Sequence, residues 1–403
     1  MAKIAVVVSN PCISDARVIK MIQAAYQNGH KVVVFCTKAA NVKAFEYTDG
    51  VEYHRFEWKP VPYILNKTFI RYLGYINKKL ARFIAIKLVF YLRYSVWAQI
   101  FSPYIAAEKP DIIHAHDLIC LPAGFKAAQI CGAKVVYDAH ELEVFRNPPL
   151  PILKKIFVSY IEKKYGRKAD AVNTVGELIK QKLAKHLNRQ DINVIYNSPI
   201  IKPTTLCIRK DLRLDNETLL LLYVGKVAVG RGIETIIYNL PHLPDNVVFA
   251  TVGPCDHSMK VKMFSLAKKL RLNDRFFILP EVRFEHVTNY IKNADAGIIQ
   301  LDTLPISYQL AMPNKLFEMA FANVPIIANQ LPEIELFLKE FNNGVIIDFS
   351  DTAQLSCLIS KLFYYKNNYK FQKEGYKRLY NKYSWEVQTK KLLNTYASLY
   401  QKQ

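Results

Sequence analysis

Short, continuously apolar runs alternate with amphipathic stretches along the whole chain. The first set of runs is Lys3–Ser9, Lys31–Cys36, Asp111–His116, Lys134–Asp138 and Ala171–Thr174, and the second is Leu219–Val224, Asn246–Val252, Phe276–Leu279, Gly297–Gln300, Val324–Ala328 and Gly344–Ile347. Strands of parallel sheets that are covered on both faces have this continuous apolar pattern. The sequence therefore predicts an α/β protein with doubly wound parallel sheets.

The first strand and helix illustrate the local signals. The strand Lys3–Ser9 leads into a loop, and a helical pattern follows from Asp15 to Asn28. Gly29 stands where a helix is expected to stop, and the next strand begins at Lys31. Glycine tolerates the left-handed conformation that commonly ends helices, so this unit predicts a strand, a helix and a second strand.

The strand pattern restarts after Asn197-Ser198-Pro199 and a basic stretch that ends at Arg213. We expect two Rossmann-like domains, over residues 1–200 and 201–375, and a helical tail over residues 376–403 that Ser384 caps. In doubly wound sheets ligands bind beyond the carboxyl ends of the strands. The ligand is therefore expected there, in a cleft that the two domains face.

Composition narrows the class of protein. Hydrophobic residues make up 51% and charged residues 22%, which provides enough material for a core and argues against disorder. No stretch of 18 residues lacks a charge, so no membrane-spanning helix is predicted, and the N-terminus is interpreted as a strand instead of a signal peptide. Seven cysteines without metal-like spacing fit reduced thiols in the cytoplasm.

The net charge of +21 indicates an anionic partner, and a basic aromatic insert over residues 58–107 concentrates part of it. That window holds no acidic residue, and its cations are Lys59, Lys67, Arg71, Lys78, Lys79, Arg82, Lys87 and Arg93. Aromatic residues are interleaved with these cations, from Trp58 to Trp97. Contact with an anionic membrane surface is favoured over a packed pair of helices, and no recognised motif supports nucleic acid.

Two segments of the second domain have the chemistry of anion binding. The turn Gly225–Gly232 follows a strand and carries Lys226 and Arg231, which suits a diphosphate, although an ordinary strand-to-helix turn would have the same pattern. Pro313 suits the first position of a helix that Asn323 ends, and Glu318 lies inside its apolar stripe. That carboxylate would bind a ribose diol or form a salt bridge.

Polar residues also gather at two strand ends of the first domain. His114, His116 and Asp117 end one strand, and His140 with Glu141 ends the next. These residue types support acid–base chemistry or the binding of sugar hydroxyl groups. Their spacing does not match a common metal-ligand motif.

Taken in order, these segments resemble the GT-B glycosyltransferases of family 4, which are retaining enzymes that use nucleotide-sugar donors. The matching segments are Asp15-Ala-Arg17-Val18, Asp111-Ile-Ile-His-Ala-His116-Asp117, Val136-Tyr-Asp-Ala-His140-Glu141, Arg167-Lys-Ala-Asp170, Val194-Ile-Tyr-Asn197, Tyr223-Val-Gly-Lys226 with Arg231-Gly-Ile-Glu-Thr, Pro313-Asn-Lys-Leu-Phe-Glu318 and Tyr383-Ser-Trp385-Glu386. The resemblance implies two Rossmann-like domains and a final helix that crosses back to the first.

The resemblance also implies roles for individual residues. Lys226 and Arg231 match the cation pair that holds the donor diphosphate, Glu318 matches the second glutamate of the EX7E motif, and His116 matches a histidine that contacts the transferred sugar. The donor site is expected to comprise Gly225, Lys226, Arg231, Asn314, Lys315 and Glu318; the acceptor or sugar pocket is expected to comprise Asn10, Asp15, Asp117, His140 and Glu141.

The chain departs from the family pattern at the first EX7E glutamate, where Leu310 stands. Asp302, from the preceding loop, is a candidate substitute. Lys226 replaces the commoner Arg and Arg231 replaces the commoner Lys, so the positive charge is kept at both positions and the bidentate guanidinium moves from the first to the second.

The expected reaction is a retaining transfer without a metal or resident cofactor, from a nucleotide sugar that is a UDP-sugar in preference to a GDP-sugar. The expected acceptor is a glycan or a lipid-linked saccharide in the synthesis of a bacterial envelope or surface polysaccharide. The enzyme itself is expected to be a peripheral protein on the inner face of the plasma membrane. Two alternatives are a nucleotide-sugar 2-epimerase of the same fold and a non-catalytic GT-B subunit, which the loss at Leu310 would permit.

Overall fold

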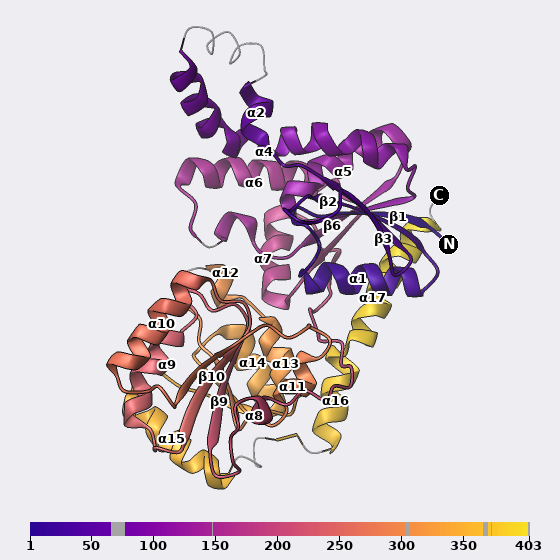
Figure 1. The fold of residues 1–403 in the computed structure, drawn as a ribbon. Coiled ribbons are helices and arrows are strands. Elements are labelled where there is room, and N and C mark those ends of the chain that lie inside the picture. The colour runs from indigo at the N-terminus through magenta and orange to yellow at the C-terminus, as the bar shows by residue number, and fades with distance from the viewer. Residues whose placement is uncertain (66–76, 147, 304–305, 366–369, 372, 402–403) are drawn as a thin grey trace. The chain divides into compact units, whose positions relative to one another are not determined.

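The computed structural model describes residues 1–65, 77–146, 148–303, 306–365, 370–371 and 373–401. Within these ranges the chain forms two compact units. The first comprises Met1–Ile195 and Thr389–Gln403, and the second comprises Tyr196–Gln388. Each unit is built on one sheet with helices around it (Figure 1), which confirms the predicted α/β class with two Rossmann-like domains.

The sheet of the first unit has the strand order β3-β4-β2-β1-β5-β6-β7-β8. All neighbouring strands are parallel except β3, which pairs antiparallel with β4. Their bounds are β1 Lys3–Val7, β2 Lys31–Thr37, β3 Phe45–Thr48, β4 Val51–Phe56, β5 Ile112–His116, β6 Lys134–Ala139, β7 Ala171–Thr174 and β8 Ile192–Val194. The order reverses between β1 and β5, which is where a doubly wound sheet opens a crevice for ligands.

Helices cover both faces of this sheet. Figure 1 shows α4, α5 and α6 over one face and α1 with α17 over the other. The bounds are α1 Ala16–Gln27, α4 Lys78–Ala107, α5 Asp117–Cys131, α6 Ile152–Gly166 and α7 Glu177–Leu187, with a short 3-10 turn, η1, at Glu143–Phe145. The strands are buried on both sides as a result, which explains their continuous apolar runs.

The first helix has the expected ends. Asp15 caps α1 by accepting a hydrogen bond from the backbone N–H of Val18, at 3.2 Å. Gly29 follows the helix with a φ of 84°, a conformation that glycine adopts without strain.

The three strands β3, β4 and β8 were not predicted, because β4 alternates buried and half-buried residues and β8 spans only three residues.

The insert over residues 58–107 consists of α2 Pro60–Leu65 and the 30-residue helix α4 in its described parts. Lys67, Phe69, Arg71, Tyr72 and Tyr75 lie outside the described residues, as do the side chains of Tyr63, Lys78 and Arg82. Residues 79–107 of α4 are long and apolar enough to cross a membrane by length and composition alone, which differs from the expectation that no helix would be, although the segment contains Lys87 and Arg93. The second half of α4 buries Trp97, Phe101 and Ile105 against the first unit, α5 being its main helical neighbour.

The second unit has an all-parallel sheet in the order β11-β10-β9-β12-β13-β14. Its strands are β9 Leu219–Val224, β10 Val247–Val252, β11 Phe276–Leu279, β12 Ala296–Ile299, β13 Ile326–Ala328 and β14 Gly344–Ile346. Its helices are α8 Ile208–Asp211, α9 Ile233–Asn239, α10 His257–Lys269, α11 Val287–Ile291, α12 Ile306–Gln309, α13 Asn314–Phe321, α14 Pro332–Phe341, α15 Thr352–Tyr365 and α16 Lys373–Tyr383, with a 3-10 turn η2 at Leu240–His242. The strand order reverses between β9 and β12.

The tail consists of two helices, not the single crossing helix predicted for residues 376–403. Helix α16 belongs to the second unit, and α17, Trp385–Tyr400, begins after Ser384 and enters the first unit from Thr389 onward. Ser384 starts the new helix because its hydroxyl accepts a hydrogen bond from the backbone N–H of Val387, at 3.4 Å. The crossing back to the first unit is therefore confirmed, with a later start.

Candidate functional site

The turn after β9 has the open backbone that a diphosphate site requires. Gly225, Gly230 and Gly232 have φ values of 117°, 76° and 72°, which non-glycine residues rarely adopt. The carbonyl oxygen of Gly225 packs so closely on Gly253 that a Cβ at Gly253 would lie 2.4 Å from it. The turn also lies at the reversal of the strand order, because the backbone N–H of Asp302, beyond β12, donates to the carbonyl of Gly230 at 3.1 Å.

Lys315 is the cation that the fold places directly at this turn. Its side chain is 6% exposed, and Nζ lies 3.5 Å from the ring centroid of Tyr223 and 3.7 Å from the position of a Cβ on Gly225. Nζ has no hydrogen-bond partner among the residues that the structure describes. Burial, reinforced by the charge of Arg231 and opposed by that of Glu318, lowers the pKa of Lys315 well below its usual range.

The other predicted donor residues surround Lys315 in different ways. The guanidinium of Arg231 lies over the ring of Tyr308, 4.8 Å from its centroid. Glu318 is half-buried one helical turn after Lys315 on α13, and Asn314 is exposed at the start of that helix, where it accepts a hydrogen bond from Asn197 at 2.8 Å.

Lys226 has a different environment from Lys315, although both were predicted for one site. Lys226 is 57% exposed, and its Nζ lies 3.4 Å from the carboxylate of Asp256. Leu310, which replaces the first EX7E glutamate, is buried after α12. Pro313 was predicted to be the first residue of α13, but it is the N-terminal cap of that helix, because its ψ of 148° is extended.

A buried ion pair organises the strand ends of the first unit. Arg17 on α1 donates to both carboxylate oxygens of Asp138, at 3.0 Å and 2.7 Å, and to the carbonyl of Ile195 at 2.6 Å. Both side chains of the pair are at most 4% exposed. Burial by itself would favour the neutral acid, but Arg17 and hydrogen bonds from His116 and His140 hold the pKa of Asp138 well below its usual range.

Three histidines adjoin this carboxylate. His116 Nδ1 lies 3.2 Å and His140 Nε2 lies 3.4 Å from Asp138 Oδ2, and the two imidazole nitrogens are 3.0 Å apart. Burial opposes the charge of His140, but Asp117 and Asp138 outweigh it and raise the pKa of His140 to about 9. His114 stacks on His116 and shares a 2.7 Å hydrogen bond with the hydroxyl of Tyr396 on α17.

The predicted acceptor residues are divided between two places. Asn10 donates to the carboxylate of Asp15 at 2.7 Å, and Asp15 caps α1, so these two side chains are engaged in holding the loop after β1. Asp117, with a φ of 62°, follows His116 directly, and its Oδ1 lies 3.6 Å from His140 Nδ1. Asp117 and Glu141 line a pocket that contains neither Asn10 nor Asp15.

Two family models together match most of the chain. The model described as Glycosyltransferase Family 4 matches residues 16–198, and the model described as Glycosyl transferases group 1 matches residues 207–378. The chain is a GT-B glycosyltransferase of the family 4 type. The predicted family and the predicted enzyme class are therefore confirmed.

Individual relatives of this glycosyltransferase are distant. An uncharacterized glycosyltransferase of Methanocaldococcus jannaschii is 21% identical over 93% of this chain and 92% of its own. Among solved structures, the sucrose-phosphate synthase of Thermosynechococcus elongatus has a TM-score of 0.75 at 17% identity, over the full length of both chains. The Anabaena protein HepE in complex with UDP-glucose has a TM-score of 0.70 at 14% identity, over 99% of this chain and 100% of that chain.

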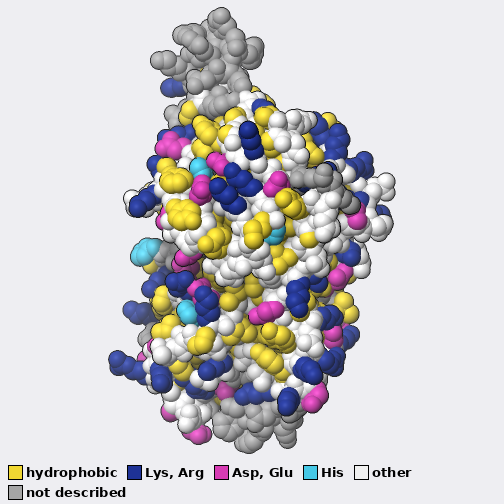
Figure 2. Space-filling model, turned by 90° about the vertical axis from the view of Figure 1, so that its right-hand side faces the viewer, with side chains coloured by type: hydrophobic (Ala, Val, Ile, Leu, Met, Phe, Trp, Pro, Cys, Tyr) yellow, Lys and Arg dark blue, Asp and Glu magenta, His cyan; other side chains and the backbone are white. Residues whose placement is uncertain are grey.

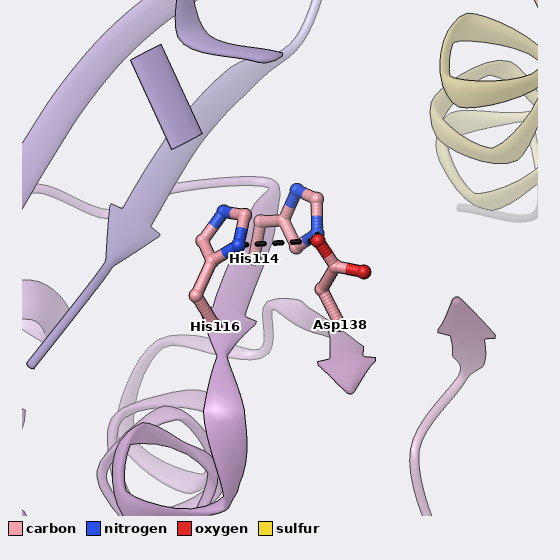
Figure 3. Close-up of side chains that lie close together, drawn as sticks. All are labelled: His114, His116 and Asp138. Atoms are coloured by element: carbon pink, nitrogen blue, oxygen red, sulfur yellow. Dashed lines mark ion pairs between the residues drawn. The ribbon is translucent and has the colours of Figure 1, made fainter. Parts of the chain in front are cut away.

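Three side chains of the histidine cluster lie close enough together to be considered as a metal centre. Ligand atoms of His114, His116 and Asp138 lie within 4.8 Å of one another, and Figure 3 shows both imidazoles on one strand beside the carboxylate of the next. Arg17, however, already occupies both oxygens of that carboxylate. A divalent cation would have to displace or approach a buried guanidinium, which like-charge repulsion opposes.

The residues that sequence reasoning missed are those whose role depends on burial. Arg17 was noted only as part of a family segment, since a lysine or arginine on a helix usually faces solvent. Tyr223 lies inside an apolar strand and gave no signal of its contact with Lys315. The apolar periodicity of α1 provided a usable signal for Arg17, because it places Arg17 beside the buried Val18 and Met21.

Proposed function

We propose that this glycosyltransferase moves a sugar, with retention of anomeric configuration, from a UDP-sugar to a saccharide acceptor. The observation that carries the donor site is the buried, unpartnered ammonium group of Lys315 at the glycine turn after β9. A lysine in that position is costly unless an anion joins it, and a diphosphate is the anion that a glycosyltransferase binds. UDP is favoured because the structurally similar HepE was crystallised with UDP-glucose.

The reaction requires charge stabilisation more than a nucleophile from the protein. When the sugar leaves, negative charge develops on the β-phosphate, and Lys315, Arg231 and the backbone N–H groups at the start of α13 would stabilise it. Lys226 would join them after leaving Asp256. No metal or resident cofactor enters this proposal, and the departing phosphate would assist attack of the acceptor on the same face of the sugar.

In the first unit, His116 is proposed to contact the transferred sugar. Its Nδ1 faces Asp138, and its Nε2 has no hydrogen-bond partner among the described residues. Asp138 and Arg17 would act as positioning residues, since they fix the ring without needing to touch the sugar.

A thermal-shift experiment with UDP-glucose and GDP-glucose tests the donor site. A ligand that binds the native state raises the melting temperature, and we expect UDP-glucose to do so in the wild-type protein. Lys315→Met should abolish most of the shift, and Glu318→Ala should reduce it. Lys339→Met is the matched control, because Lys339 is 71% exposed on α14 and pairs only with Glu335 among the described residues. Unchanged shifts in both Lys315→Met and Glu318→Ala would refute the donor site.

We further propose that the enzyme works as a peripheral protein on the cytoplasmic face of the membrane. Positive charge alone does not select a surface, because Lys and Arg side chains are spread widely over the face drawn in Figure 2. Exposed apolar side chains indicate a particular surface better than charge does, because several of them lie together on α6. On α6, Ile152, Leu153, Ile156 and Tyr160 are 59–75% exposed, with Lys154, Lys155, Lys163 and Lys164 on the same helix.

Helix α4 extends this apolar and basic surface. Its Phe83 and Ile86 are 58% and 53% exposed, and Lys154 of α6 lies over the ring of Phe90, 4.5 Å from its centroid. Apolar side chains flanked by lysines suit an anionic bilayer, where the rings and aliphatic groups enter the interface and the lysines face phosphates. An acceptor presented at the membrane, such as a lipid-linked saccharide of a surface polysaccharide, would fit this location.

Co-sedimentation with vesicles tests this surface. The protein should bind vesicles that contain phosphatidylglycerol more strongly than neutral ones, and binding should weaken as salt rises. The double variant Ile152→Ser and Ile156→Ser should lose binding, while Lys268→Gln with Lys269→Gln, two exposed lysines of α10, should keep most of it. Equal binding to neutral and anionic vesicles would contradict the proposal.

The alternatives of an epimerase and a non-catalytic subunit receive no specific support. Family membership favours transfer, and the replacement of a glutamate by the buried Leu310 does not remove the cations of the donor site. Asp302 stays a candidate for the missing carboxylate, because its Cβ lies 3.6 Å from the position of a Cβ on Gly230.

A further inference from the structure

Two tyrosine rings lie against two cations of the donor site. The Nζ atom of Lys315 lies 3.5 Å from the ring centroid of Tyr223, and the guanidinium of Arg231 lies 4.8 Å from the ring centroid of Tyr308. The face of an aromatic ring carries partial negative charge, and it attracts a cation that lies within about 6 Å of the ring centroid. Lys315 and Arg231 therefore each have an aromatic partner that the protein itself supplies.

The ring of Tyr223 is fixed at both ends. Tyr223 is the fifth residue of β9, it is 1% exposed, and its backbone is in register with Thr251 of β10. Its hydroxyl donates to the backbone carbonyl of Lys226, in the turn, at 2.9 Å. Burial raises the pKa of Tyr223 to about 12, so the phenol stays neutral at physiological pH. Strand and turn together thus present a neutral ring face to Lys315.

Tyr308 reaches the turn from a different segment, the short helix α12 beyond β12. The side chain of Gln309 ties this helix to the preceding loop by donating to the carbonyl of Thr303, at 2.7 Å. That loop is in turn tied to the glycine turn, since the backbone N–H of Asp302 donates to the carbonyl of Gly230 at 3.1 Å. The ring of Tyr308 is therefore positioned by the same segment that contacts the turn.

The two cations need a partner that does not neutralise them. Burial and then the charge of Arg231 lower the pKa of Lys315, so each positive charge disfavours the other. Nζ of Lys315 has no hydrogen-bond partner among the described residues. A carboxylate paired directly with this ammonium would compete with a phosphate for it. An aromatic face attracts the cation and leaves its charge available to an anion.

We propose that Tyr223 and Tyr308 are positioning residues of the donor site, whose rings hold Lys315 and Arg231 in place for the diphosphate of the donor. The proposal rests on the proposed function, because the diphosphate is the ligand of that reaction. Each tyrosine acts through the cation that it faces and does not have to touch the donor. The ring, and not the hydroxyl group, carries the effect.

Isothermal titration of the full-length protein with UDP-glucose tests this role, because a pair of variants at each position separates the ring from the hydroxyl. Tyr223→Leu removes the ring, and we expect it to weaken binding about tenfold, which corresponds to about 1.4 kcal/mol for a buried contact between a cation and a ring. Tyr308→Leu should weaken binding about threefold, because its contact is longer and the ring is only half-buried. Tyr223→Phe and Tyr308→Phe keep the ring and should bind within about twofold of the wild-type protein.

A similar contact elsewhere in the second unit provides the matched control. The ring of Phe264 lies 5.9 Å from Nζ of Lys260 on α10, and Phe264 is 40% exposed. Phe264→Leu removes an aromatic contact of the same kind far along the chain from the turn. It should leave the affinity for UDP-glucose unchanged.

The pH dependence of binding distinguishes a positioned charge from a general loss of packing. The diphosphate attracts the charged form of Lys315, so affinity should fall as pH rises past the pKa of that group. Tyr223→Leu should move this fall to lower pH, because the ring no longer stabilises the ammonium, and Tyr223→Phe should not. Arg231 from the turn and Glu318 from α13 are the other charged groups that act on Lys315, and neither is altered in these variants.

The outcomes separate this proposal from the proposed function. Equal affinities in the wild-type protein and both leucine variants would overturn the proposal and leave the proposed function intact. Equal losses in the leucine and phenylalanine variants would also overturn it, because the hydroxyl groups would then carry the effect. If Tyr223→Leu fails to fold, Tyr308→Leu decides the test, since Tyr308 is half-buried. If UDP-glucose does not bind the wild-type protein, the proposed function is wrong and this proposal fails with it.

Discussion

Replacing Arg17 by methionine should destabilise the first unit strongly. The change leaves the carboxylate of Asp138, which is fully buried, without its main positive partner. Removing one member of a buried ion pair costs about 3–5 kcal/mol. His116 and His140 still face Asp138, so we expect the lower part of this range, about 3 kcal/mol of unfolding free energy.

Urea unfolding followed by tryptophan fluorescence measures this loss. In a Trp385→Phe background, Trp58 and Trp97 report on the first unit alone, which avoids the mixed transition of a chain with two units. The double variant Arg17→Met with Asp138→Asn should recover at least about 1 kcal/mol relative to the sum of the two single changes, because it removes both charges. A loss below about 1 kcal/mol in Arg17→Met, or strict additivity in the cycle, would refute the reasoning.

Three further predictions concern pH, the donor turn and the last helix. The pKa of His140 is raised to about 9 in the folded state, so the stabilisation from its charged form is complete below pH 6.5 and is lost as pH rises to about 9. His140→Gln should flatten the fall in unfolding free energy between these pH values, and an unchanged slope would contradict this prediction. Gly253→Ala should lower UDP-glucose affinity several-fold in a titration, because its Cβ would lie 2.4 Å from a backbone oxygen of the turn. Gly132→Ala is the control: Gly132 has a φ of 79° and open space around it, so the change should cost only about 1 kcal/mol of unfolding free energy. Tyr396→Phe removes the buried hydrogen bond to His114 and should reduce unfolding free energy by about 1 kcal/mol in denaturant titrations; no change would show that the bond is not formed in solution.

Much of the fold could be predicted from the sequence because both sheets are buried and all strand pairs except β3 with β4 are parallel. Strands such as Leu219–Val224, and Lys3–Val7 after its first residue, are continuously apolar, which leaves little ambiguity about their type. The strands at the edges of the first sheet, and β4 next to one edge, were harder. Val51–Phe56 alternates in burial and contains Glu52, His54 and Arg55, so it lacks the signal that identified the others.

The candidate site was predictable at the level of segments and less so at the level of side chains. Spacing drew attention to the turn after β9 and the start of α13, but it could not show that Lys315 is buried at that turn while Lys226 is exposed beside Asp256. Burial of a single long side chain depends on tertiary packing, which periodicity does not encode. The sequence analysis named Asp117 and Glu141 of the pocket in the first unit, but it did not name Trp97 and Glu143, because these residues come from distant segments that only the fold brings together.

The path of α17 has a consequence for biosynthesis. Residues from Thr389 onward belong to the first unit, and Tyr396 reaches His114 inside it. During translation, the N-terminal domain of most chains can finish folding before the rest has been made. Here the first unit cannot make its last contacts until α17 has been synthesised, and by then the ribosome has already synthesised all of the second unit.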